Sequence, residues 1–143
     1  IEMPNSGAPG LAYAVIQDDE IQSKARGEIV VDSGRKATSN TPFVIGSISK
    51  SFTAIAVMQL VEIEKVALDS PISQYLKAFS DQSSGTVTIR QLLSHTSGYS
   101  TLQGNTARSD MTTNEDILSQ QVTQVAQWPL ANKPGSRWEY WYG

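Results

Sequence analysis

A serine and a lysine stand three residues apart in the stretch FVIGSISKSFT, residues 43–53. Residues at this spacing lie on one face of a helix, with Cβ atoms about 5–6 Å apart, so the Ser47 hydroxyl and the Lys50 amine can meet. A serine hydroxyl is a weak nucleophile until a neighbouring base takes its proton. The pattern therefore allows nucleophilic chemistry, with Ser47 as the nucleophile and Lys50 as its base.

Lys50 can serve as a base only as a neutral amine, since an ammonium group has no lone pair. An apolar helix around it and the positive end of the helix dipole both disfavour the charged form. Backbone N–H groups at the helix start can bind an oxyanion, and Gly46 lets other backbone approach. The spacing alone also fits a solvated Lys50 and a Ser47 that only caps the helix. A lysine in a helix that is apolar nearly all round is hard to place in solvent, which favours the chemical interpretation.

Other catalytic and ligand-binding patterns are weaker or absent. No serine is framed as G-x-S-x-G, and neither G-x-x-x-x-G-K-[ST] nor G-x-G-x-x-G occurs. A Ser-His-Asp triad would need His95, the only histidine. It stands near a predicted helix C-terminus, where bonding to the last carbonyls is favoured over catalysis. The acidic run 18–20 could hold a hard cation, but a hairpin turn is favoured. We expect no cofactor and no metal.

Composition and charge narrow the class of protein. The 143 residues suffice for one ordinary domain, and 39% hydrophobic with 17% charged residues is typical of a globular chain. A net charge of −3 and the lack of a Lys/Arg run argue against nucleic acid as a partner. The longest uncharged apolar region, 52–61, is shorter than the roughly 20 residues that span a bilayer, so we expect no transmembrane segment.

The elements that must position these residues are predicted as strands followed by helices. Gly10–Gln17 and residues 21–31 are rich in β-formers and indicate an antiparallel hairpin or meander. A helix is predicted over about 47–64. Its apolar residues cover most of the circumference, which is typical of a buried helix. They include Ile48, Phe52, Ala54, Ile55, Val57, Met58 and Val61.

Smaller helices are predicted over the rest of the chain. Strands followed by helices indicate an α+β fold, with the antiparallel strands packed on the buried S-x-x-K helix beside a small helical region. So few strands make a poor sheet, whose bare edge favours self-association. The predicted features are a helix over 71–77 capped by Ser70, a Thr88–Gln91 capping box whose helix ends at Gly98, a helix from Thr113 or Asn114 that stops before Pro129, and a strand or lining segment over 138–142.

Four stretches between about Gly7 and Tyr140 carry a resemblance to a known family: FVIGSISKSFTAIAVMQLVE, LDSPISQYL, TIRQLLSHTSGY and PGSRWEY. Together they resemble the serine β-lactamase-like family, which includes class C β-lactamases, penicillin-binding D-alanyl-D-alanine carboxypeptidases and related esterases. This resemblance implies a partial serine β-lactamase-like (transpeptidase-type) fold and a serine hydrolase. Such an enzyme forms an acyl-enzyme with a lactam, ester or D-alanyl amide carbonyl, from a small-molecule or peptidoglycan-type substrate. The resemblance also implies a periplasmic or secreted location.

The resemblance assigns roles to three residues. Ser47 matches the nucleophile of the family, and Lys50 matches its partner base. Tyr140 matches the tyrosine of the Tyr-x-Asn motif, which would share proton transfer with Lys50. The alternative is that Tyr140 and its aromatic neighbours, Trp138, Trp141 and Tyr142, are core residues.

The sequence departs from the family pattern in two places. Tyr142 stands where the family has an asparagine that is expected to orient the substrate and Lys50. The third motif, Lys-Thr-Gly or His-x-Gly, is not found in the sequence. We therefore expect residues 1–143 to be the N-terminal part of a single domain that is incomplete at its C-terminus, with residues dropped near Tyr140. The alternative is a non-catalytic relative, or an inactive fragment, that serves as a binding or oligomerising module.

Overall fold

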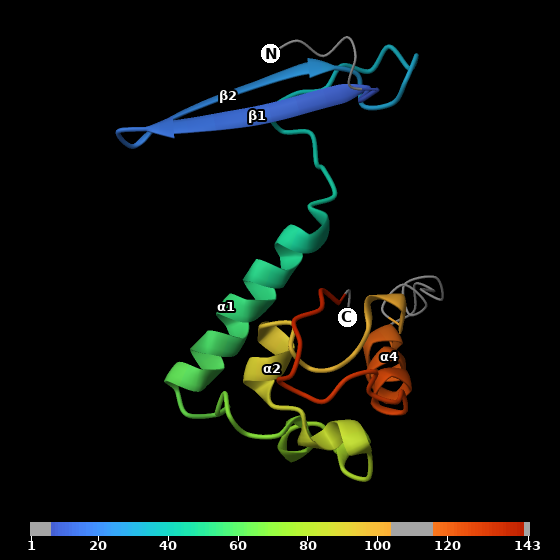
Figure 1. Cartoon of the computed structure of the whole chain (residues 1–143). Helices are drawn as coiled ribbons and strands as arrows, with labels where there is room; N and C mark the ends of the chain where they lie inside the picture. The colour runs from blue at the N-terminus through green and yellow to red at the C-terminus, as the bar shows by residue number, and fades with distance from the viewer. Residues whose placement is uncertain (1–6, 104–115, 142–143) are drawn as a thin grey trace. The chain divides into compact units, whose positions relative to one another are not determined.

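The computed structural model describes residues 7–103 and 116–141 (Figure 1). The chain divides into two compact units, residues 1–46 and 47–143. The first unit holds a two-stranded sheet, and the second holds the helices. No helix within the described ranges has the length and apolar character needed to cross a membrane.

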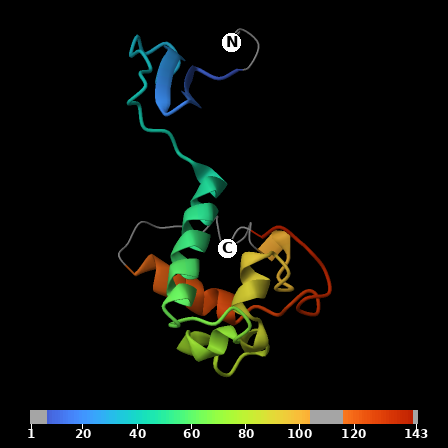
Figure 2. The same cartoon turned by 90° about the vertical axis from the view of Figure 1, so that its left-hand side faces the viewer.

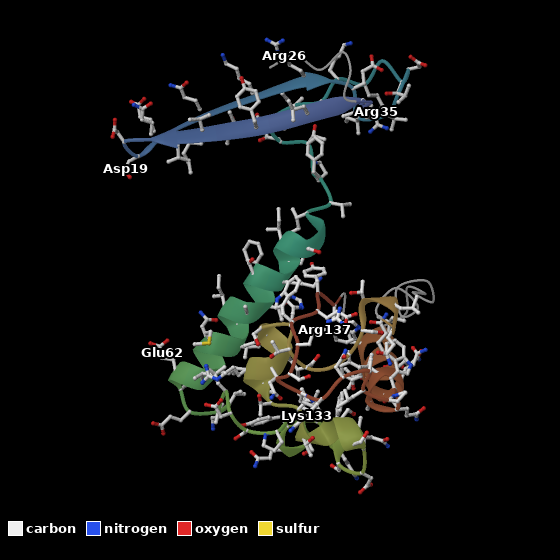
Figure 3. All side chains as sticks on the ribbon, in the orientation of Figure 1. Asp19, Arg26, Arg35, Glu62, Lys133 and Arg137 are labelled. Carbon is white, nitrogen blue, oxygen red and sulfur yellow. The ribbon has the colours of Figure 1, made fainter. Side chains whose placement is uncertain are left out.

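The first unit is built on an antiparallel hairpin. Strand β1 (Gly10–Gln17) pairs with β2 (Glu20–Gly27) along its whole length. The turn uses Asp18 and Asp19, whose φ angles of 49° and 66° match the two-residue connection that suits the twist of a hairpin. Figure 3 shows Asp19 at the tip of the strands. The hairpin interpretation of the acidic run is therefore confirmed.

Strand β2 is shorter than the predicted 21–31 because the chain turns at Gly27. This glycine has a φ of +78°, outside the strand region, and a Cβ on it would lie 2.2 Å from the carbonyl oxygen of Pro9. Only a glycine fits such a position without strain. Beyond it, Glu28 makes an isolated bridge to Lys36 instead of extending the strand.

Helix α1 (Ser49–Glu62) follows a 3-10 turn, η1 (Gly46–Ile48), and matches the predicted helix over most of its length. The predicted burial is wrong, since α1 has no buried residue. Val57 packs against the hydrophobic core, whereas Phe52 and Ile55 are 63% and 59% exposed. The described residues cover only one flank of a helix that is apolar nearly all round. Figure 3 labels Glu62, the last residue of α1.

The core of the second unit lies among α1, α2 (Ile89–Leu93), α4 (Ile117–Ala126) and two 3-10 turns (Figure 2). Its buried members are Ile72, Phe79, Ile89 and Ala126. The predicted capping box of α2 is confirmed. Gln91 N–H donates to Thr88 Oγ1 at 3.2 Å, and Thr88 N–H donates to Gln91 Oε1 at 3.0 Å.

The helix predicted over 71–77 is wrong. The chain forms 3-10 turns there, η2 (Ile72–Gln74) and η3 (Lys77–Phe79), followed by η4 (Ser83–Thr86). Pro71 is extended and bridges to Thr88, and Ile72 N–H donates to the carbonyl of Val87 at 2.8 Å. The carbonyl of Ser70, which would accept the first bond of a helix starting at Pro71, accepts from Ile89 N–H at 3.3 Å instead, so only short turns form.

Helix α2 ends at Leu93 rather than running to Gly98. The left-handed residue after its end is His95, with a φ of 58°. His95 N–H donates to the carbonyl of Leu92, and Thr96 N–H donates to that of Gln91 at 2.9 Å. These two bonds form a Schellman motif, in which glycine is the usual left-handed residue.

The remaining predictions concern the C-terminal part of the chain. Helix α4 ends at Ala126, so Trp128 is not helical and the helix stops before Pro129 is reached. The predicted start at Thr113 or Asn114 lies outside the described residues. Residues 138–141 form no strand, and Tyr142 lies outside the described residues.

Candidate active site

The hydroxyl of Ser47 is held between an amine and a phenol. Ser47 lies in η1, and Lys50 is the second residue of α1. Lys50 Nζ donates to Ser47 Oγ at 3.4 Å. The phenol of Tyr140, 93 residues further along the chain, donates to the same oxygen at 2.7 Å. The structure therefore brings together all three residues that the resemblance singles out.

The phenol of Tyr140 lies in surroundings that favour its ionised form. The hydrogen bond with Ser47 has the largest effect and lowers the pKa of Tyr140. Partial burial raises this pKa, but the hydrogen bond and the positive charge of Lys50 lower it again, so that the net shift is downward. Lys50 Nζ also lies 5.3 Å from the centre of the Tyr140 ring. A phenolate beside a lysine is a suitable proton acceptor for a serine hydroxyl.

The surroundings of Ser47 and Lys50 are more open than the sequence predicts. Ser47 is exposed and Lys50 is half-buried. The apolar shell that α1 was expected to provide is only partly present, because α1 has no buried residue. No side chain caps the start of α1, so no capping oxygen competes there with an oxyanion for the first backbone N–H groups.

Tyr140 is held in place by contacts with the segment that follows α2. His95 lies with its ring 4.6 Å from the Tyr140 ring, at an interplanar angle of 35°. Its carbonyl accepts from Glu139 N–H at 2.9 Å, and its Nδ1 accepts from Trp141 N–H at 3.3 Å. The predicted bond from His95 to a last-turn carbonyl of α2 is made by its backbone N–H, which donates to Leu92, and not by its imidazole. Its left-handed backbone turns the side chain toward residues 139–141 instead.

Thr101 also holds this segment, through the backbone carbonyl of Tyr140 and the side chain of Glu139. Thr101 Oγ1 donates to the carbonyl of Tyr140 at 2.6 Å, and Thr101 N–H donates to Glu139 Oε1 at 2.8 Å. Trp141 stacks on Tyr99 at 5.0 Å, and the Tyr99 phenol donates to the carbonyl of Val125 in α4. These bonds tie the site to the core of the second unit.

The aromatic residues near the C-terminus have different environments. Trp141 and its stacking partner Tyr99 are buried, at 9% and 1% exposure, so the core interpretation holds for Trp141. Trp138 is 64% exposed and therefore is not a core residue. Tyr140 is half-buried with its hydroxyl on Ser47, which differs from the pattern of a core aromatic.

Comparison with known proteins gives the family. The family model described as Beta-lactamase matches residues 2–141. The chain belongs to the β-lactamase family. The resemblance predicted from the S-x-x-K stretch and LLSHTSG is thus confirmed.

Three relatives illustrate the range of the β-lactamase family that this chain resembles. Esterase EstB of Burkholderia gladioli is 34% identical over 130 residues, which are 82% of this chain and 33% of the esterase. The D-alanine carboxypeptidase AmpC from Burkholderia cenocepacia has a TM-score of 0.71 and 27% identity, over 92% of this chain and 34% of that one. The octameric penicillin-binding protein homologue from Pyrococcus abyssi has a TM-score of 0.74 and 29% identity, over 93% of this chain and 32% of that one.

The chain spans about a third of the length of these relatives. The fold is therefore a partial β-lactamase fold, with two antiparallel strands and a group of helices. About two thirds of each relative has no counterpart here, which accords with the uncovered flank of α1. That residues 1–143 are the N-terminal part of one longer domain stays a prediction.

Proposed function

We propose that this chain carries the acylation site of a serine hydrolase, in which Ser47 attacks a lactam, ester or D-alanyl amide carbonyl. The observation that supports this proposal is that Ser47 Oγ accepts two hydrogen bonds, from the Tyr140 hydroxyl at 2.7 Å and from Lys50 Nζ at 3.4 Å. Membership of a family of serine hydrolases adds to this support.

In the first step, the Tyr140 phenolate takes the proton of Ser47 while Ser47 Oγ bonds to the carbonyl carbon. Lys50 stabilises the phenolate by its charge and orients the serine oxygen by its hydrogen bond. Backbone N–H groups at the start of α1 bind the tetrahedral oxyanion. When the intermediate collapses, the C–N or C–O bond breaks, and the leaving amine or alkoxide takes the proton from Tyr140.

In the second step, water hydrolyses the acyl-enzyme. The Tyr140 phenolate, free of its proton again, takes a proton from water as the hydroxide bonds to the acyl carbon. The bond to Ser47 Oγ then breaks, the serine recovers its proton from Tyr140, and the carboxylic acid leaves. The substrates are small acyl compounds, in line with the esterase and the D-alanine carboxypeptidase that the chain resembles.

The test is covalent labelling of Ser47. The folded chain is incubated with a fluorescent penicillin or a fluorophosphonate, and the adduct is located by peptide mass spectrometry. We expect one adduct, on Ser47, and none in Ser47→Ala. A folded sample, with native circular dichroism and a cooperative thermal transition, that forms no adduct would overturn acylation by this chain.

A second candidate function is a non-catalytic binding module. It is favoured by Tyr142, which stands where the family pattern has an asparagine that orients the substrate. This candidate predicts that acyl ligands raise the thermal midpoint without turnover. Hydrolysis of nitrocefin or a p-nitrophenyl ester by the wild type, and its loss in Ser47→Ala, would exclude it.

A further inference from the structure

Three consecutive residues, 139, 140 and 141, all contact His95. The His95 carbonyl accepts from Glu139 N–H, its ring packs on Tyr140, and its Nδ1 accepts from Trp141 N–H. The segment that carries Tyr140 has no helix or strand of its own within the described residues. A phenol on an irregular segment keeps its place only through such contacts with a rigid neighbour.

The backbone of His95 lies in the left-handed region, with a φ of 58°, where a residue with a side chain is less favourable than glycine. The Schellman motif at the end of α2 would be satisfied better by glycine. Glu64 takes the same conformation in the same motif at the end of α1, so what sets His95 apart is that its side chain contacts Tyr140 and Trp141.

The imidazole of His95 acts here in its neutral form. Because Nδ1 accepts a hydrogen bond from Trp141 N–H, that nitrogen carries no proton. Burial, and then the positive charge of Lys50, lower the pKa of His95, which keeps the ring neutral. A neutral ring packs on Tyr140 without adding a second positive charge beside Lys50.

From this geometry, and given the proposed acylation by Ser47, we propose that His95 is a positioning residue that holds the Tyr140 phenol on Ser47. It acts through Tyr140 and takes no proton in the reaction. This gives the histidine of the LLSHTSG stretch a role that the chemistry of Ser47 and Lys50 alone does not explain.

The test uses His95→Gly, which removes the ring and Nδ1 but relieves the left-handed backbone. If only the backbone conformation of position 95 mattered, His95→Gly would keep the site unchanged and would be at least as stable as the wild type. The matched control is Glu64→Gly. Glu64 has the same φ of 58°, and its N–H and that of Lys65 make the same pair of Schellman bonds at the end of α1. Glu64 is exposed and lies outside the site.

Two measurements are compared in the whole chain. The first is the titration of the Tyr140 phenol by ¹³Cζ NMR, with the signal assigned by its absence in Tyr140→Phe. The second is the rate of Ser47 labelling by a fluorophosphonate. We expect His95→Gly to return the Tyr140 pKa toward its ordinary value and to slow labelling on the order of 10- to 100-fold. Glu64→Gly should change neither.

His95→Asn is the second variant, because asparagine tolerates the left-handed region and offers an oxygen near the position of Nδ1. We expect it to recover part of the labelling rate and part of the Tyr140 shift. The proposal is overturned if His95→Gly keeps the wild-type titration of Tyr140 and the wild-type rate of Ser47 labelling. It is also overturned if Glu64→Gly slows labelling and shifts the Tyr140 titration as much as His95→Gly does. If the wild type is not labelled but His95→Gly still abolishes the Tyr140 shift, the acylation function fails while the positioning role stands.

Discussion

The Tyr140 phenol donates a 2.7 Å hydrogen bond to Ser47 Oγ across 93 residues of sequence. Lys50 reaches the same oxygen from within the next turn of chain, at 3.4 Å. One hydroxyl is therefore in contact with two groups that can take its proton, and the shorter contact is the one made by Tyr140. From this difference in distance we expect the phenol to take the larger share of proton transfer in the proposed acylation.

Tyr140→Phe should slow acylation of Ser47 by about 10²- to 10⁴-fold, the usual contribution of a positioned general base. The ring contact with His95 and the hydrogen bond from Thr101 to the Tyr140 carbonyl do not use the hydroxyl, so folding should be preserved. Fluorophosphonate labelling and thermal unfolding measure the two effects. Labelling within threefold of the wild type would exclude Tyr140 as the base.

The rate of acylation should rise with pH through the pKa of Tyr140, since the phenolate is the form that accepts the proton. The hydrogen bond with Ser47 and then Lys50 keep the pKa of Tyr140 below the ordinary tyrosine value of about 10. Lys50→Met removes a cation that favours the phenolate, so the rise should move to higher pH. The midpoint of this rise is measured from labelling rates at neutral to alkaline pH. Lys65→Met is the control for the loss of a positive charge. A profile that does not move in Lys50→Met would contradict this electrostatic role.

The parts of the site that sequence predicts well are those set by neighbours along the chain. The S-x-x-K spacing brings Ser47 to Lys50 because both residues belong to one turn of chain. The capping box of Thr88 and Gln91 is likewise a contact over three residues. By contrast, spacing carries no information on the contact between Tyr140 and Ser47, which only the resemblance to the β-lactamase family indicates.

The predictions that fail are of two kinds. One kind concerns which residues cover a helix, and the other concerns which residue takes the left-handed conformation at a helix end. The pattern of α1 correctly gives a helix, but burial requires partners that the described residues do not provide. Gly98 was expected to end α2 because glycine is the usual left-handed residue, yet His95 takes that conformation. Because α2 ends at Leu93, the left-handed position after its end falls on residue 95. Histidine occurs in the left-handed region more often than most residues, and this preference is the signal in the sequence for such an early end.

Gly98→Ala should destabilise the second unit by about 2 kcal/mol or more, the range for a strained left-handed residue with an added clash. Its φ is +96°, and a Cβ would lie 2.3 Å from the carbonyl oxygen of Asn132. Gly135→Ala is the control, since its φ of +79° is also left-handed but its nearest atom is the end of the flexible Gln91 side chain, at 3.2 Å. Denaturant unfolding compares the two. Equal losses would show that the contact with Asn132 adds nothing.

The exposed flank of α1 should make the chain self-associate, in addition to the predicted association through the sheet edge. Phe52 and Ile55 are more than half exposed, at 63% and 59%, and adjacent apolar side chains in water drive association. Phe52→Glu with Ile55→Glu should lower the mean mass in multi-angle light scattering at high concentration. Ser51→Glu with Thr53→Glu, on the same helix, adds the same two negative charges without removing apolar surface and should leave the mass unchanged. If the charged α1 variant keeps the mass of the wild type while a β1 variant, Val15→Lys, lowers it, the sheet edge and not α1 carries the association.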